Sequence, residues 1–169
     1  MKANLIRIDG DIAIITLTRG YETVIDAADL ALIAKNKWYA IPDHSQITAY
    51  AATSMRIGDC KTTVMLHRFI LGADKNYVVD HIDGDGMNNR RNNLRLATRQ
   101  ENSMNQRRSK NNKSGFKGVS WVEARQKWHA RICLQRKSYH LGLFESAQEA
   151  HAAYVAASKS LHKEFGRPG

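Results

Sequence analysis

The chain of 169 residues has little of what marks several large protein classes. It contains only two prolines and two cysteines, and aromatic residues make up 8% of it. The scarcity of proline excludes a proline-rich disordered chain, and the isolated Cys60 and Cys133 exclude a disulfide scaffold or zinc ribbon. No apolar run approaches the roughly 18 residues of a membrane span, and the first residues alternate too soon for a signal peptide. We therefore expect a cytoplasmic protein.

Basic residues are in excess, and the excess lies at one end of the chain. There are 26 Lys and Arg residues against 16 Asp and Glu residues, a net charge of +10. Residues 1–66 hold seven basic and seven acidic residues, whereas residues 103–169 hold thirteen basic and four acidic, a net charge of +9. This asymmetry predicts a polyanionic partner for the C-terminal part, although a solvated basic tail would have the same charge.

The pattern of residues 1–66 predicts a small β-rich scaffold. Apolar runs at residues 5–8 and 12–17 flank Asp9-Gly10-Asp11, which predicts a hairpin. An Ala- and Leu-rich stretch that opens with Asp26 predicts a short helix ending near residue 34. Further short strands are predicted at residues 38–40, 48–52 and 62–66. No catalytic constellation is recognisable in this part.

Residues 67–109 predict a strand, a loop, a second strand and a helix, in that order. The first strand, at residues 77–79, ends in Asp80-His81 and is followed by a loop rich in turn residues. The second strand covers residues 94–97, and the capping box from Thr98 to Glu101 predicts a helix that begins at Arg99. Such a unit folds its ends together, so we expect Asp80, His81 and Asn102 to lie near one another.

Three segments of this unit resemble the HNH endonuclease motif: Val79-Asp80-His81-Ile82-Asp83-Gly84, Asn92-Asn93-Leu94-Arg95 and Glu101-Asn102. The form is similar to that of bacteriophage-encoded homing endonucleases, in which Asn replaces the final His. The resemblance implies a ββα-metal fold and, if the chain is phage-encoded, a place in the bacterial host cell.

Roles for individual residues follow from this resemblance. Asp80 and Asn102 would coordinate one divalent cation, and His81 would be the general base that activates water. Asn93 would hold the loop so that His81 points correctly. Oxygen ligands suit Mg²⁺ or Mn²⁺ better than Zn²⁺. Arg91 and Arg95 are candidate contacts to the scissile-strand phosphates, or else solvated loop charges.

Two other features of this unit have competing interpretations. Asp83-Gly84-Asp85-Gly86 hints at an EF-hand calcium loop, but Met87 and Leu94 stand where ligands are required, so we reject a calcium site. His67, within Leu66-His67-Arg68, is a candidate for a functional role, but we interpret it as a structural residue.

The last part of the chain predicts a three-stranded antiparallel sheet with one helix on its apolar face. Residues 127–134 alternate, and a second strand follows over residues 136–144. Ser146 opens a capping box and a helix. The predicted inner face of the two strands comprises Trp128, Ala130, Ile132, Leu134, Tyr139 and Leu141. The predicted inner face of the helix comprises Ala150, Ala153, Tyr154, Ala157 and Leu161.

This unit resembles an AP2 DNA-binding domain in Ser114-Gly115-Phe116-Lys117-Gly118-Val119, Lys127-Trp128-His129-Ala130, Leu141-Gly142-Leu143-Phe144 and Ala147-Gln148-Glu149-Ala150. Such domains lay their sheet in the major groove of DNA. Ser120 and His140 replace residues typical of plant AP2 domains, so their base preference is not transferred. The candidate DNA contacts are Arg107, Arg108, Lys110, Lys113, Lys117, Lys127, His129, Arg131, Arg136 and His140.

Together these patterns predict an α+β protein with three parts: a scaffold at 1–66, an HNH unit at 67–109, and an AP2-like domain at 110–169 that begins with a basic linker. We expect a site-specific, metal-dependent endonuclease that acts on double-stranded DNA, nicks one strand, and is a monomer or weak dimer. One alternative is a DNA-binding regulator with an inactive HNH unit. Another is an RNA-binding protein, which the lack of exposed aromatic pairs disfavours.

Overall fold

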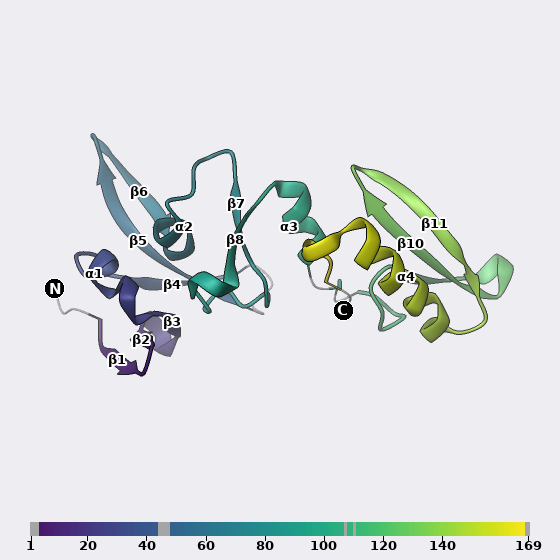
Figure 1. The fold of residues 1–169 in the computed structure, drawn as a ribbon, viewed down its shortest axis with the longest axis horizontal. Helices are drawn as coiled ribbons and strands as arrows, with labels where there is room; N and C mark the ends of the chain where they lie inside the picture. The colour runs from purple at the N-terminus through teal and green to yellow at the C-terminus, as the bar shows by residue number, and fades with distance from the viewer. Residues whose placement is uncertain (1–3, 44–47, 107, 110, 168–169) are drawn as a thin grey trace. The chain divides into compact units, whose positions relative to one another are not determined.

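The computed structural model describes residues 4–43, 48–106, 108–109 and 111–167. The chain forms two compact units, Met1–Thr98 and Arg99–Gly169 (Figure 1). Among the described residues, no helix combines the length and apolar character that crossing a membrane would require. Helices and sheets occur in both units, in agreement with the predicted α+β class.

The first unit begins with the antiparallel sheet β1-β2-β3, made of β1 (Ile6–Asp9), β2 (Ile12–Thr16) and β3 (Glu22–Asp26). The predicted hairpin is confirmed, and Gly10 at its turn has a φ of +57°, which favours glycine. The strand β3 is not predicted by the sequence pattern. Its buried positions are Thr23 and Ile25, so a polar residue interrupts the apolar pattern that usually marks a strand.

A second antiparallel sheet, β4-β5-β6, follows, with β4 (Tyr39–Pro42), β5 (Ala49–Ile57) and β6 (Cys60–Met65). The short helices of this region are the 3₁₀ turns Thr18–Gly20 and Ala27–Asp29, α1 (Leu30–Ile33) and α2 (Leu66–Leu71). One apolar core includes Ile15, Trp38, Leu66, Val79 and Leu94. That core crosses the boundary expected from the sequence between residues 66 and 67.

The HNH-like strands form a separate two-stranded antiparallel sheet, β7 (Val78–His81) and β8 (Leu94–Ala97), as predicted. The 3₁₀ turn Arg91–Asn93 directly precedes β8. Between the strands, the chain returns to the first sheet and forms a parallel bridge from Asn88 to Val24 of β3. The segment that carries the motif is therefore anchored on the N-terminal region.

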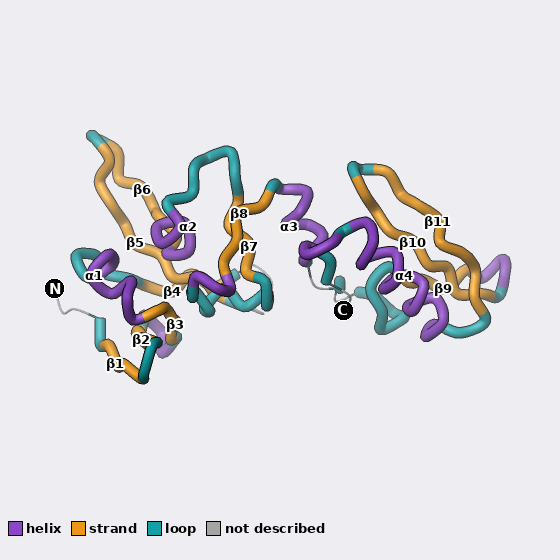
Figure 2. The backbone as a smooth tube through the Cα atoms, viewed as in Figure 1, coloured by secondary structure: helices purple, strands orange, loops and turns teal. Residues whose placement is uncertain are grey.

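The second unit contains α3 (Arg99–Asn105), β9 (Val119–Val122), β10 (Lys127–Leu134), β11 (Lys137–Phe144) and α4 (Ala147–Leu161), with 3₁₀ turns at Glu123–Arg125 and Lys163–Phe165. Its sheet has the order β11-β10-β9, and α4 packs along one face (Figures 1 and 2). The backbone N–H of Glu149 donates to the Ser146 hydroxyl, which confirms the predicted cap of α4. The predicted sheet with one covering helix is thus present.

Two positions of the predicted inner face differ in the structure. Leu161 is 37% exposed, whereas Ser158 and His162 on the same helix end are buried. The ring of His162 lies 2.9 Å from the carbonyl oxygen of Cys133, so a hydrogen bond satisfies its buried position. Tyr139 is 43% exposed, in the part of β11 that follows the hairpin turn.

Candidate functional site

Asp80 and His81 are the last two residues of β7, and both are buried, with 4% and 6% of their surface exposed. Asp80 lies opposite Arg95 in the strand register. The guanidinium of Arg95 donates to Oδ2 of Asp80 from Nε at 2.8 Å and from NH2 at 2.7 Å. Arg95, a candidate phosphate contact from the sequence, therefore neutralises a buried carboxylate.

His81 is enclosed by polar and aromatic side chains of the first unit. Its Nε2 lies 3.2 Å from Oδ1 of Asn89. The rings of His67 and Tyr50 lie with their centroids 5.0 Å and 6.0 Å from that of His81. Burial lowers the pKa of His81, and the Asn89 hydrogen bond and the carboxylates of Asp80, Asp83 and Asp85 only partly oppose it. The ring is thus neutral near pH 7, as a proton acceptor must be.

Asn93 closes the loop that follows His81. Its Oδ1 accepts from the backbone N–H of Asp83 at 3.1 Å, and its Nδ2 donates to Oδ1 of Asp83 and to the carbonyl of Asn88. Its own backbone carbonyl accepts from the N–H of Ile82. Four hydrogen bonds from one buried residue fix the backbone immediately after His81, which is the arrangement that a loop-holding residue requires.

Asn102, expected as a metal ligand, lies in α3 of the second unit and is half-buried. Within the described part of the chain, no three His, Cys, Asp or Glu side chains form a cluster that could hold a metal ion. Asp80 and Asn102 offer one carboxylate and one amide, which are hard oxygen donors suited to Mg²⁺ or Mn²⁺. Each of these oxygens taken by itself suits such a cation; Asp80 belongs to the first unit and Asn102 to the second, and joint ligation by the two stays a prediction.

The arginines that precede Asn93 are bound to the first sheet and its neighbouring turn. Arg91 donates to both carboxylate oxygens of Asp29, at 2.8–3.1 Å, and Arg90 pairs with Asp26 and Asp11. Arg91 was a candidate phosphate contact. The structure instead uses its guanidinium to tie the motif segment to the N-terminal region.

The second unit presents a basic face on the side of its sheet that α4 leaves uncovered. Side chains alternate along β10, so His129 and Arg131 lie on one face of the strand and the buried Ala130 and Ile132 on the other. Arg131 pairs with His140 in the strand register, and the rings of His129 and His140 have centroids 4.7 Å apart. Partial burial, His140 and Arg131 all lower the pKa of His129. These three side chains are close enough to contact one ligand together.

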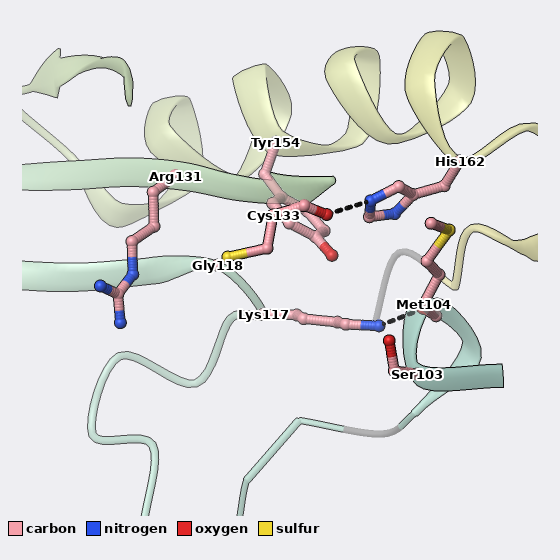
Figure 3. A pocket seen from close by; sticks show the side chains of 8 residues that line it. All are labelled: Ser103, Met104, Lys117, Gly118, Arg131, Cys133, Tyr154 and His162. Atoms are coloured by element: carbon pink, nitrogen blue, oxygen red, sulfur yellow. Dashed lines mark hydrogen bonds between the residues drawn. The ribbon is translucent and has the colours of Figure 1, made fainter. Parts of the chain in front are cut away.

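Lys117 does not belong to that face. Its ammonium donates to the carbonyl of Met104 at 2.7 Å (Figure 3). It also donates to the carbonyls of Gln106 and Arg167, at 2.7 and 3.2 Å. Burial lowers its pKa to about 8. The side chain thus joins the end of α3 and the C-terminal segment, and its ammonium, expected from the sequence to contact DNA, is bound by backbone carbonyls.

The remaining candidate contacts have diverse positions. Lys127 forms an exposed ion pair with Glu145 at 2.8 Å, and Arg136 stands in the β10–β11 turn with a φ of +62°. Arg108 and Lys113 are exposed in the segment before β9. Arg107 and Lys110 lie outside the described residues.

Three residues near His81 were not predicted to belong to the site. Asn89 and Thr23 are fully buried and joined by a hydrogen bond of 2.8 Å. His67 is 9% exposed, and its Nδ1 has no hydrogen-bond partner among the described residues. The pair Asn88-Asn89 was interpreted as turn residues, and only long-range contacts show the role of Asn89. Similarly, no local pattern distinguishes Thr23 from other strand threonines.

Comparisons with known proteins agree with this geometry. A family model described as HNH endonuclease matches residues 71–104. "Protein 3.8" of Escherichia phage T7 is 38% identical over 95 residues, which are 55% of this chain and 76% of that protein. An uncharacterized HNH endonuclease of Acanthamoeba polyphaga mimivirus is 28% identical over 143 residues, 81% of this chain and 68% of that protein. No solved structure matches.

Proposed function

We propose that this chain is an HNH-type, site-specific DNA endonuclease that nicks one strand, as a homing endonuclease does. One observation carries the proposal. The matched segment holds a buried, neutral histidine directly after a carboxylate, and Asn93 fixes the loop that follows. Hydrolysis of a phosphodiester bond needs a positioned base for water and a Lewis acid.

In this proposal, His81 is the general base. A ring nitrogen accepts a proton from the attacking water, and the imidazolium that forms is stabilised by the carboxylates of Asp80, Asp83 and Asp85. Asn93 holds the backbone of residues 82 and 83, so the chain that directly follows His81 is fixed before DNA binds. His81 is therefore the residue whose removal abolishes cleavage.

Asp80 and Asn102 would hold one Mg²⁺ or Mn²⁺ ion. When bound there, the cation would stabilise the negative charge that develops on the leaving oxygen. Arg95 orients the Asp80 carboxylate through its two hydrogen bonds. Those hydrogen bonds both reach Oδ2, and they fix the side chain before any cation binds.

DNA would be held by the second unit, whose sheet face carries His129, Arg131 and His140. We propose that this AP2-like sheet enters the major groove, where side chains contact base edges and phosphates. Arg108, Lys113, Lys127 and Arg136 would add phosphate contacts around it. Arg91 and Arg95 are left out because each binds a buried carboxylate, and Lys117 because it binds backbone carbonyls; the ion pair of Lys127 with Glu145, in contrast, is exposed.

A DNA-binding regulator with an inactive nuclease unit is the second candidate, favoured by the concentration of charge in the second unit. The experiment that separates the two starts with bound sequences selected from a random DNA pool. A supercoiled plasmid that carries the selected site is then incubated with Mg²⁺ and with wild type or His81→Ala. We expect nicking by wild type alone. Equal nicking by both, or none at any metal concentration, would contradict the endonuclease.

A further inference from the structure

We propose that Asn89 and Thr23 form a relay that fixes the tautomer of His81, so that Nε2 carries the ring proton and Nδ1 is the nitrogen that acts as base. The tautomer follows from the hydrogen bonds alone, and only the role of Nδ1 as the base rests on the proposed function. The relay makes Asn89 and Thr23 positioning residues, and it gives the N-terminal sheet a part in the reaction.

Backbone carbonyls accept hydrogen bonds and never donate them, so the carbonyls that contact Thr23 and Asn89 fix the direction of each hydrogen bond in the relay. The Thr23 hydroxyl lies 2.8 Å from the backbone carbonyl of Met87, so it donates its single hydrogen there. It can then only accept from Asn89, 2.8 Å away, and the Asn89 atom facing it must be the amide nitrogen. The same nitrogen lies 3.3 Å from the carbonyl of Gly86, which independently requires a donor.

The other end of the Asn89 amide is therefore its oxygen, and an amide oxygen only accepts. It lies 3.2 Å from Nε2 of His81. Nε2 must carry a hydrogen to form this bond, and in a neutral ring the lone pair then resides on Nδ1. Asn89 is fully buried and His81 is 6% exposed, so water cannot easily replace the bond if the tautomer changes.

Backbone contacts with two strands hold the relay in place. The N–H of Val24 donates to the carbonyl of Met87 at 2.9 Å, and the N–H of Asn89 donates to the carbonyl of Val24 at 2.7 Å. Nearby, the N–H of Gly86 donates to the Thr48 hydroxyl, and a Cβ on Gly86 would lie 2.4 Å from the carbonyl oxygen of Ala49. The loop therefore sits directly on β3 and on the start of β5, which leaves Asn89 little freedom to turn.

The tautomer is measured directly by NMR on the full ¹⁵N-labelled chain without metal, at about pH 7.5, above the ordinary pKa of histidine. Long-range ¹H–¹⁵N spectra distinguish the two ring nitrogens, and the signals of His81 are those lost in His81→Ala. We expect wild type to show the proton on Nε2. A proton on Nδ1 in wild type overturns the relay, whether or not any variant folds.

Variants then test the relay itself. Asn89→Leu removes the acceptor and should give a mixture of tautomers, and Thr23→Val should give a smaller change in the same direction. The matched control is Thr53→Val, because Thr53 is also buried and its hydroxyl also donates to a backbone carbonyl, that of Lys37. Thr53→Val should keep the wild-type spectrum. An unchanged His81 spectrum in folded Asn89→Leu contradicts the relay.

Cleavage kinetics separate the relay from the proposed function. On the selected DNA site with Mg²⁺, Asn89→Leu should lower kcat at least about 10-fold while KM stays within about 2-fold, because only the base is misaligned. Thr53→Val should cleave like wild type. Cleavage by wild type and Asn89→Leu at equal rates overturns the relay and leaves the endonuclease standing. The expected spectra in a wild type that never cleaves overturn the endonuclease and leave the tautomer assignment standing.

Discussion

At the scale of single residues, the first unit contains two buried histidines that contact each other. His67 and His81 meet edge to face with their ring centroids 5.0 Å apart, and burial lowers the pKa of both. For His67, burial, followed by the charges of His81 and Arg68, lowers the pKa to about 3. The structural interpretation of His67 in the sequence remains a prediction, but the side chain now has a titration behaviour that can be measured.

The depressed pKa of His67 predicts an acid-sensitive fold. The unfolded chain takes up a proton at this residue near pH 6.5, whereas the folded chain does so only near pH 3, so stability is lost as pH falls from 6.5. Between pH 6.5 and about 4.5, this residue should lower the free energy of unfolding by about 2 to 3 kcal/mol. Urea unfolding at both pH values, compared with His67→Leu, measures that difference.

The variant should lose less stability than wild type over the same interval, because it lacks His67; the loss that remains comes from groups present in both proteins, such as His81. Equal losses in the two proteins would show that His67 is protonated in the folded state. Carboxylates that begin to titrate at the lower end of the interval do so in both proteins, so the difference between the two isolates His67.

The sequence revealed part of this residue-scale picture. Asp80, His81 and Asn93 were selected from the motif, and the structure brings them together in one unit. Asn89 and Thr23 were missed because 66 residues separate them and each resembles an ordinary turn or strand residue locally. Arg91 and Arg95 were assigned to DNA because their carboxylate partners come from elsewhere in the fold.

At the scale of elements, the second unit depends on a close approach between β9 and α4. Gly118, just before β9, has a φ of +73°, and a Cβ there would lie 2.2 Å from the Tyr154 ring and 2.7 Å from the carbonyl oxygen of Arg131. The N–H of Arg131 donates to the Gly118 carbonyl at 2.9 Å, so the backbone cannot retreat without breaking this bond. Glycine is therefore required at this position for two reasons: there is no room for a Cβ atom, and the backbone has a left-handed conformation.

Gly118→Ala should therefore destabilise the second unit by about 3 kcal/mol, from left-handed strain plus overpacking against Tyr154. Gly115→Ala is the matched control, since Gly115 has a φ of +78° and a Cβ added there would meet nothing within 4 Å. It should cost only about 1 kcal/mol. Urea unfolding followed by circular dichroism measures both, and similar losses would refute the packing argument.

Elements were predicted best where the pattern was long and regular. The strands of the second unit and α4 follow their alternating and helical periods, and the Ser146 cap marks where the helix begins. The short elements β3 and α2 were missed, because tertiary pairing and packing determine them more than local pattern does. The exposure of Leu161 has a similar cause, since the hydrogen bond of His162 to Cys133 fixes which side of the last turn is buried.

At the scale of the whole molecule, charge divides between the two units. The net charge of +9 over residues 103–169 falls in the second unit, whereas acidic residues pair with arginines in the first. In the proposed division of work, the second unit supplies affinity through phosphate contacts and the first supplies the reaction. The family match at residues 71–104 agrees with a nuclease function near the middle of the chain.

This division predicts a position-dependent loss of DNA affinity. Arg131→Ala should weaken binding about 5- to 10-fold and reduce the slope of log affinity against log salt by about 1, because one phosphate contact is lost. Lys159→Ala removes the same charge from an exposed position on α4, the helix that covers the opposite face of the sheet. It should change the affinity by less than about 2-fold. Equal effects of the two variants in a salt titration would indicate charge alone, without a defined face.

The central claim is that one protein holds DNA with its second unit and cuts it with His81 of its first. The most direct measurement follows binding and cleavage together, on one labelled duplex that carries the selected site, with Mg²⁺ and with wild type or His81→Ala. The account predicts that both proteins bind with affinities within about 2-fold, while His81→Ala cleaves at least about 100-fold more slowly. Equal cleavage by the two proteins, or binding by wild type without any cleavage, would contradict it.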